Sequence, residues 1–281
     1  MPEKSISVAV ASMLGNEQRL SKFLRQNAET LARFPEVILV IQGLRQDDLA
    51  GSPIARMIRQ AAPEARVFAM PEFGIGRSRN LALKQAANDY LWFLDDDVQV
   101  EPRAYELLSA AIATHPAEVY CAEIANSEDG SPYKDYGPMR DRYCQDAREL
   151  IKRSSIEIMA ATDFCRRQRI AFSESIGVGT RYPSGEEVLF LLDAFGGGAG
   201  IYFVPAVTVR HPRRLNDLAK IGERDHLISK GVILRRFGFF YGLGVIAGWI
   251  RQYAFKGMQP RHIGYLLTGF RRSRRILAGG P

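Results

Sequence analysis

Apolar residues recur along the first hundred positions in two rhythms, which together predict alternating strands and helices. Four runs rich in β-branched and aliphatic side chains predict strands, at residues 5–11, 37–41, 66–70 and 90–94. Between them, apolar residues spaced three or four apart predict helices, at residues 16–33, 53–62 and 72–88. Strands that alternate with helices favour a mostly parallel sheet with right-handed crossovers. The pattern therefore predicts an α/β fold.

The second part of the chain has a weaker hydrophobic periodicity, which predicts fewer elements. We expect a helix over 102–114, strands over 117–125 and 155–161, a polar loop or lid over 126–153, a helix from residue 186 and a last strand over 201–204. Beyond this point the composition changes. We therefore expect a domain over residues 1–215, with halves 1–98 and 99–215, followed by a basic helical extension over 216–281.

Three carboxylates, Asp95, Asp96 and Asp97, stand directly after the run at 90–94. A buried strand cannot continue into three charges, so they should lie at its solvated carboxyl end. In open α/β sheets, ligands bind at that end. Three acids at one strand tip repel one another unless a cation neutralises them, and oxygen ligands suit Mg²⁺ or Mn²⁺. The stretch is therefore either a metal site or a solvated acidic turn.

The composition is that of a globular protein, but the charge is unevenly spread. The 281 residues are 46% hydrophobic and 25% charged, with a net charge of +7. Residues 205–281 hold fifteen Lys and Arg against three acidic residues, so this part carries +12 and the rest carries −5. A basic tail on an acidic body suggests contact with an anionic membrane surface or with nucleic acid, or simply a solubilising role.

The tail also contains an apolar run of fourteen residues, 237–250, flanked by arginines. A membrane-spanning helix needs about 20 residues, so we expect an interfacial helix or a buried helical hairpin. The first residues lack the apolar region of a signal peptide. Three cysteines without metal-ligand spacing favour free thiols in a reducing compartment. We therefore expect a cytoplasmic protein, peripheral on the inner face of the cell membrane.

Separated motifs follow one another in a fixed order. They are Asp95-x-Asp97, the Phe172-Ser173-Glu174 segment with the glycine-rich residues 176–179, Gly185-Glu186-Glu187, and Tyr202-Phe203-Val204-Pro205 followed by His211. In this order they resemble the family-2 glycosyltransferases of the GT-A fold, including members that build bacterial surface polysaccharides. The resemblance implies a mixed, mostly parallel sheet flanked by helices. It also implies a nucleotide-sugar half at 1–98, an acceptor half at 99–215 and a membrane-associating helical extension.

The resemblance further implies an activity. We expect inverting transfer of a sugar from a nucleotide-diphosphate sugar, a UDP-sugar first, to a hydroxyl of a saccharide or lipid-linked saccharide. Mn²⁺ or Mg²⁺ held by Asp97 and Asp95 would offset the charge of the leaving diphosphate. Asp95 could instead lie near the ribose. His211 would complete the metal or diphosphate site, or else simply pack after the last strand.

The other residues expected to bind the donor are Gln42, Gly74, Arg79, Asn80 and Asp96. Gln42 stands where family members usually carry an aspartate that reads the base, and a neutral amide can still form hydrogen bonds to a base. Gly74 would let the backbone approach the nucleotide, and Arg79 offers a planar fork of donors. The alternative is a tight glycine turn before a helix, with its arginines solvated.

Two adjacent glutamates open the helix predicted from residue 186. Glu187 stands at the position of the family's catalytic aspartate, so the resemblance implies that it is the general base for the acceptor hydroxyl. Glu186 would orient the acceptor or cap the helix. The alternative is that both acids only complement the helix dipole as first-turn residues.

Two rival functions belong to other classes. A nucleotidyltransferase acting on sugar phosphates also uses a parallel sheet and an acidic metal site. It typically has a glycine-rich, basic signature after the first strand, which Ser12-Met13-Leu14-Gly15 lacks. A non-catalytic sugar- or nucleic-acid-binding module would not need both the acidic strand tip and the glutamate pair. We expect no nucleic-acid partner.

Overall fold

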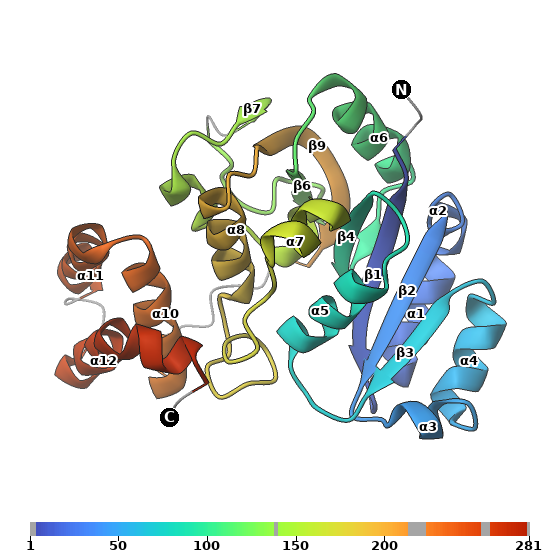
Figure 1. Cartoon of the computed structure of the whole chain (residues 1–281), viewed down its shortest axis with the longest axis horizontal. Helices are drawn as coiled ribbons and strands as arrows, with labels where there is room; N and C mark the ends of the chain where they lie inside the picture. Colours follow the sequence, from blue (N-terminus) through green and yellow to red (C-terminus); the bar gives the residue numbers. More distant parts are fainter. Residues whose placement is uncertain (1–3, 138–139, 213–222, 254–258, 280–281) are drawn as a thin grey trace.

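A mixed nine-stranded sheet runs through the residues that the structure, a computed structural model, describes: 4–137, 140–212, 223–253 and 259–279 (Figure 1). The strand order is β3-β2-β1-β4-β8-β6-β9-β5, and β7 pairs with β9. The strands are β1 (Ile6–Met13), β2 (Glu36–Gln42), β3 (Arg66–Met70), β4 (Tyr90–Asp95), β5 (Gln99–Val100), β6 (Val119–Asn126), β7 (Arg142–Tyr143), β8 (Ile158–Ala161) and β9 (Ile201–His211). The α/β fold expected from the sequence is confirmed.

The strands β3, β2, β1 and β4 are parallel to one another, as their alternation with helices predicted. The register pairs Met13 with Gln42, and Ala11 with Asp95. The carboxyl ends of β1, β2 and β4 therefore meet at one edge of the sheet. Next to them, β8 pairs antiparallel with both β4 and β6, which joins the two parts of the chain in one continuous sheet.

Helices cover both faces of this sheet (Figure 1). One face packs against α1 (Glu17–Gln26), α4 (Pro53–Ala61) and α6 (Ala104–Thr114), and the other against α5 (Ile75–Gln85), α7 (Thr162–Gln168) and α8 (Glu186–Gly196). Shorter helices are α2 (Ala28–Leu31), α3 (Gln46–Leu49) and the 3-10 turns η1 (Ala147–Leu150) and η2 (Ser155–Glu157). A strand buried on both faces needs apolar side chains on both, which explains the unbroken run at 90–94.

Three helices follow the sheet and pack beside α8: α10 (Arg224–Arg236), α11 (Phe239–Tyr253) and α12 (Pro260–Leu277) (Figure 1). At the crossing of α10 and α12, a Cβ on Gly231 or on Gly269 would overlap the backbone of the other helix. The two helices therefore touch backbone to backbone. Among the described residues, no helix has both the length and the apolar character needed to cross a membrane. The predicted boundary between 215 and 216 lies outside the described residues.

Two predicted bounds were wrong because distant residues decide them. The helix predicted over 16–33 breaks at Asn27, whose buried amide donates to Val98 O at 3.2 Å and accepts from Val100 N at 2.7 Å. The strand predicted to stop at residue 204 continues to His211. Pro205 does not end it, because this residue falls at an irregularity in the β6–β9 pairing, where a missing N–H is tolerated.

The remaining differences concern short elements. The loop predicted over 126–153 contains β7 and η1, and the strand predicted over 155–161 begins with the turn η2. The helices α3 and α7 and the strand β5 had no predicted counterpart. Each of these elements has seven residues or fewer. Hydrophobic periodicity needs a longer window than that to be recognised.

Candidate active site

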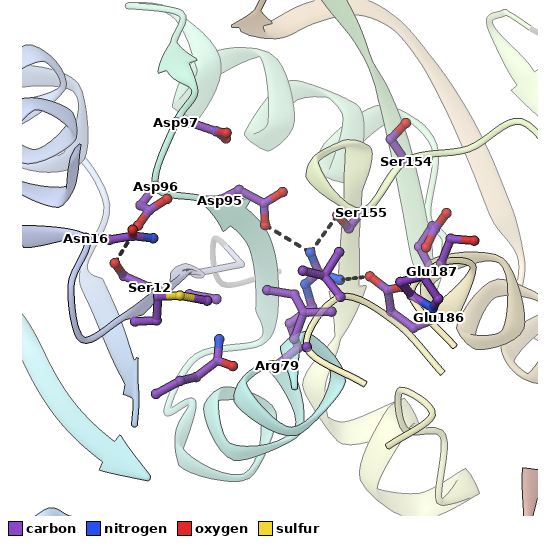
Figure 2. Close-up of a pocket in the computed structure, with 18 of the residues that line it drawn as sticks. Ser12, Asn16, Arg79, Asp95, Asp96, Asp97, Ser154, Ser155, Glu186 and Glu187 are labelled. Atoms are coloured by element: carbon purple, nitrogen blue, oxygen red, sulfur yellow. Dashed lines mark hydrogen bonds and ion pairs between the residues drawn. The ribbon is translucent and has the colours of Figure 1, made fainter. Parts of the chain in front are cut away.

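A cavity of about 560 Å³ opens at the carboxyl ends of β1, β2 and β4. Segments far apart in the sequence line it, and Figure 2 shows several of their side chains around one space. The polar and charged lining residues are Ser12, Asn16, Arg19, Gln42, Arg79, Asp95, Asp96, Asp97, Ser154, Ser155, Ser184, Glu186 and Glu187. The acidic strand tip and the glutamate pair, predicted from separate motifs, therefore belong to one cavity.

Arg79 connects the two acidic groups. Its side chain is only 3% exposed, with Nη1 2.8 Å from Glu186 Oε1 and Nη2 3.0 Å from Asp95 Oδ1 (Figure 2). Nη2 also donates to Ser155 Oγ at 2.7 Å, and the guanidinium lies 5.3 Å from the centre of the Phe172 ring. A planar fork with several fixed donors suits such a bridge. In this arrangement Arg79 positions Asp95 and Glu186.

Asp96 is the buried member of the triplet. Its side chain is fully buried, accepts a hydrogen bond from Ser12 Oγ and forms an ion pair with Arg19. Burial raises the pKa of Asp96, although Ser12 and Arg19 act in the opposite direction. The side chains of Asp95 and Asp97 are 35% and 22% exposed. These two carboxylates are therefore the accessible ones.

Asp97 lies beside His211. His211 Nε2 is 3.4 Å from Asp97 Oδ1, and His211 Nδ1 is 2.8 Å from the carbonyl oxygen of Pro212. Since a carbonyl can only accept, Nδ1 carries a proton and donates to it. In a neutral imidazole, the lone pair of Nε2 then faces a carboxylate oxygen. Two acceptors this close call for a proton or a cation between them.

This donor set fits a divalent metal in part. Among the described residues, no group of three or more His, Cys, Asp or Glu side chains is arranged to hold an ion. Mg²⁺, however, usually takes one or two carboxylates and fills its other positions with water and substrate phosphates. Asp97 and His211 could supply the protein ligands in such an arrangement, whereas Asp95 is engaged by Arg79.

Arg19 is a charged residue of the site that sequence reasoning missed. It is the third residue of α1, pairs with Asp96 through Nη2, and places Nη1 3.7 Å from Asp97 Oδ2. A cation in the first turn of a helix opposes the helix dipole. This unfavourable position was the available signal in the sequence, because it indicates that an acidic group lies near Arg19 and compensates the charge. Arg19 offsets part of the charge at the strand tip.

The glutamate pair divides into a buried and an accessible member. Glu186 is 5% exposed and is held by Arg79. Glu187 is half-buried on the cavity wall. Desolvation, followed by repulsion from Glu186, raises the pKa of Glu187 to about 8. A carboxyl group with such a pKa can exchange a proton near neutral pH.

The remaining predicted donor residues lie around the start of α5. Gln42 lines the cavity, and its Oε1 accepts from Gly74 N at 2.7 Å, so its amide N–H groups are the donors it could offer a base. Asn80 donates to Phe172 O at 3.0 Å and accepts from Phe172 N at 2.8 Å. It fixes a loop and is not among the residues that line the cavity. A Cβ on Gly76 would overlap the carbonyl of Ser173, so loop packing requires this glycine.

The comparisons with known proteins show the family. Residues 12–171, more than half of the chain, match the model of glycosyl transferase family 2. No curated protein matches the chain in sequence.

Solved structures share the fold. Residues 1–349 of S. aureus TarS in complex with UDP-GlcNAc align with a TM-score of 0.65 and 17% identity, over 97% of this chain and 81% of that chain. In a longer TarS structure, the chain spans 43% of the length. Glucosyl-3-phosphoglycerate synthase from Mycobacterium tuberculosis, in complex with Mn²⁺, UDP and glucosyl-3-phosphoglycerate, aligns with a TM-score of 0.55 and 17% identity, over 84% and 81% of the two chains. The predicted GT-A fold with a helical C-terminal region is confirmed.

Proposed function

The chain belongs to glycosyl transferase family 2, and from this premise we propose that it transfers a sugar from a UDP-sugar to an acceptor hydroxyl with inversion at the anomeric carbon. The observation that carries the proposal is that the acidic tip of β4 and the glutamate pair of α8 line the same cavity. A charge-binding group and a proton-accepting group are the two functions that this reaction needs. Membership of this family disfavours both the nucleotidyltransferase and the non-catalytic module.

The donor diphosphate lies at the strand tip in this proposal. Gln42 at the end of β2 faces the same cavity and meets the base through its amide donors. Asp97 and His211 would hold Mn²⁺ or Mg²⁺, which would supply Lewis-acid stabilisation of the charge on the leaving diphosphate. The Mn²⁺ and UDP in the synthase complex support this choice of partners. Asp95 lies between this position and Arg79 and is expected near the ribose.

Glu187 acts on the other side of the cavity. It removes the proton from the acceptor hydroxyl while that oxygen attacks the anomeric carbon. The bond between this carbon and the diphosphate oxygen breaks as the new bond forms, so UDP leaves and the configuration inverts. Glu186, held by Arg79, keeps Glu187 beside a second carboxylate and so preserves its raised pKa.

The decisive variant is Glu187→Gln. Removing a general base should lower the transfer rate by roughly 10²–10⁴-fold, while UDP-sugar affinity stays within about twofold because the donor groups are intact. UDP release is measured with a panel of UDP-sugars, Mn²⁺ and a panel of saccharide acceptors. Glu72→Gln, an exposed site before α5, serves as the matched control. Turnover at the wild-type rate in Glu187→Gln would refute the assignment of the base.

We also propose that the acceptor is lipid-linked and belongs to surface polysaccharide synthesis. Phe240 is 87% exposed and Phe239 49% exposed at the start of α11. The neighbouring helix α12 exposes four arginines, at positions 271, 272, 274 and 275. Apolar residues beside arginines suit the surface of an anionic membrane, where each basic residue contributes about 1 kcal/mol. Such binding would place the enzyme on the inner face of the cell membrane.

Vesicle flotation tests the membrane proposal. The full chain should float with vesicles containing anionic lipid and remain in solution with zwitterionic vesicles. Phe240→Glu should reduce flotation, whereas Glu72→Gln should not. A point variant is preferable to truncation at residue 216, because α10 packs on α8 and its removal would uncover core side chains. Equal recovery with both vesicle types would contradict the proposal.

A further inference from the structure

A second cavity, of about 300 Å³, is lined by Glu187. Ser184, Gly185 and Glu187 line both this cavity and the larger one at the strand tip. The two chambers therefore meet at the start of α8, and Glu187 lines each of them. The far wall of the second chamber comes from α10 and α11, outside the sheet domain.

The two chambers differ in chemistry. The strand-tip cavity contains the three aspartates, both glutamates and the bridging Arg79. In the second chamber, Glu187 is the only acidic residue among the described lining residues. The others include Lys152 and Lys230, the aromatic rings of Tyr241 and Trp249, and aliphatic side chains such as Ile233. The second chamber thus combines two cations with an apolar wall.

This wall is held against the active-site loop. A Cβ on Gly185 would overlap Ile233 Cδ1, so α10 packs directly on the residue that precedes the glutamate pair. Arg236, at the end of α10, forms an ion pair with Asp193 of α8. The wall therefore occupies its position without help from a ligand.

We propose that this chamber binds the terminal sugar of the acceptor, and that this sugar carries a carboxylate or phosphate. The assignment rests on the proposed function, since an acceptor hydroxyl at the junction of the two chambers would lie beside Glu187 and face the donor in the strand-tip cavity. A volume of about 300 Å³ corresponds to roughly ten water molecules, which is the size of one sugar ring with a substituent. The rings of Tyr241 and Trp249 suit the apolar face of that sugar, and the lysines suit its negative charge.

The C-terminal helices consequently form part of the acceptor site. Residues 230–249 supply one lysine, both aromatic rings and much of the aliphatic wall. A membrane role for α11 and α12 is compatible with this, because the exposed Phe239 and Phe240 are not among the chamber residues. The same helices would then hold the acceptor sugar on one side and the lipid surface on the other.

Matched monosaccharides test the chamber. The full-length protein, saturated with UDP and Mn²⁺, is titrated with methyl β-D-glucuronide, methyl β-D-glucoside and glucose 6-phosphate. The chain has two tryptophans, and Trp92 is 0% exposed, so a fluorescence change reports on Trp249. The better of the two anionic sugars should bind about tenfold more tightly than the glucoside, a difference equivalent to one well-placed charge interaction. Which of them binds better distinguishes a carboxylate from a phosphate.

Substitutions in the second chamber test whether the sugars bind there. Lys230→Gln should remove the preference for the anionic sugar, and Arg251→Gln, an exposed site on α11, should preserve it. Trp249→Ala, followed by saturation-transfer NMR, should lose both kinds of sugar, with Trp249→Phe as a milder variant should the first fail to fold. Equal affinity for all three sugars, or a preference that survives Lys230→Gln, would overturn the assignment. If the wild-type protein does not bind UDP, the proposed function is refuted instead. Failure of the acceptor assignment and failure of the proposed function therefore give different results.

Discussion

The tip of β4 and the start of α8 both present adjacent carboxylates, but in different surroundings. In each group one member is buried against an arginine: Asp96 against Arg19, and Glu186 against Arg79. The accessible members have different surroundings. Asp97 lies near Arg19 and His211, whereas Glu187 lies in a desolvated position beside another carboxylate.

This difference favours different roles for the two acidic groups. Arg19 places a positive charge near Asp97, whereas desolvation and a like charge raise the pKa of Glu187. We infer that the β4 tip binds charge and that the start of α8 moves a proton. Arg79 joins the two and keeps their spacing.

Removing the bridge should have the largest effect on stability. Arg79→Met leaves the buried carboxylate of Glu186 without its partner, and breaking a buried ion pair costs about 3–5 kcal/mol. Urea denaturation measures the loss. Arg77→Met is the matched control, because Arg77 is 39% exposed and lies 3.7 Å from the half-exposed Glu174; the change there should stay below about 1 kcal/mol. Equal losses in the two variants would show that Arg79 is no bridge.

Substitutions of the accessible Asp97 and of the buried Asp96 should have different effects on Mn²⁺-dependent UDP binding. Asp97→Asn should weaken Mn²⁺-dependent UDP binding by roughly 10–100-fold, since it removes a proposed metal ligand. Asp96→Asn should change this affinity much less but lower the unfolding temperature, because it disturbs the contacts with Ser12 and Arg19. Calorimetric titration with UDP, with and without Mn²⁺, measures both affinities. Unchanged metal dependence in Asp97→Asn would remove Asp97 from the metal site.

The raised pKa of Glu187 predicts two pH effects. The base is active when deprotonated, so the transfer rate should rise with pH and level off above about 8. Glu186→Gln should move this rise to lower pH, because a repelling carboxylate is lost. A rate that is flat between pH of about 6 and 9, a window on both sides of the raised pKa, would exclude Glu187 as the titrating base.

Stability should change with the opposite sign. The folded state holds a proton on Glu187 up to pH of about 8, whereas the unfolded state loses it near its ordinary pKa. This contribution is therefore present at low pH and is lost as the pH rises through 8. At pH 9 Glu187→Gln should melt roughly 3 °C above the wild type, and the gap should close near pH 5, as measured by thermal unfolding.

Arg19 should give the smallest effect. Arg19→Gln removes a cation that shares the strand tip with the proposed metal, so Mn²⁺ affinity in the presence of UDP should rise by about two- to fivefold. Arg25→Gln, an exposed site in the last turn of α1 that does not line the strand-tip cavity, is the control. A fall in Mn²⁺ affinity would mean that Arg19 assists the metal and the diphosphate instead of competing with the metal.

Much of the fold could be predicted because its signals are local. The apolar run at 90–94 followed by acids marks a buried strand and its exposed end, whatever the rest of the chain does. Long helices such as α8 carry enough turns for their period to be recognised. Asn27 and Pro205 show where this fails. Their effects depend on Val98 and on the β6–β9 register, which are set by segments far away in the sequence.

The sequence by itself determined the order of the motifs, the family and the acidic end of β4. It also brought Glu187, Asp97 and His211 forward as candidates. Tertiary structure alone decided which acid of each group is buried, that Arg79 is enclosed between two carboxylates, and that Arg19 joins the site. It also placed residues of α10 and α11 with Glu187 in the lining of one cavity. The physical reason is that burial, and with it the pKa and direction of a side chain, depends on contacts between residues up to about a hundred positions apart, which no local pattern contains.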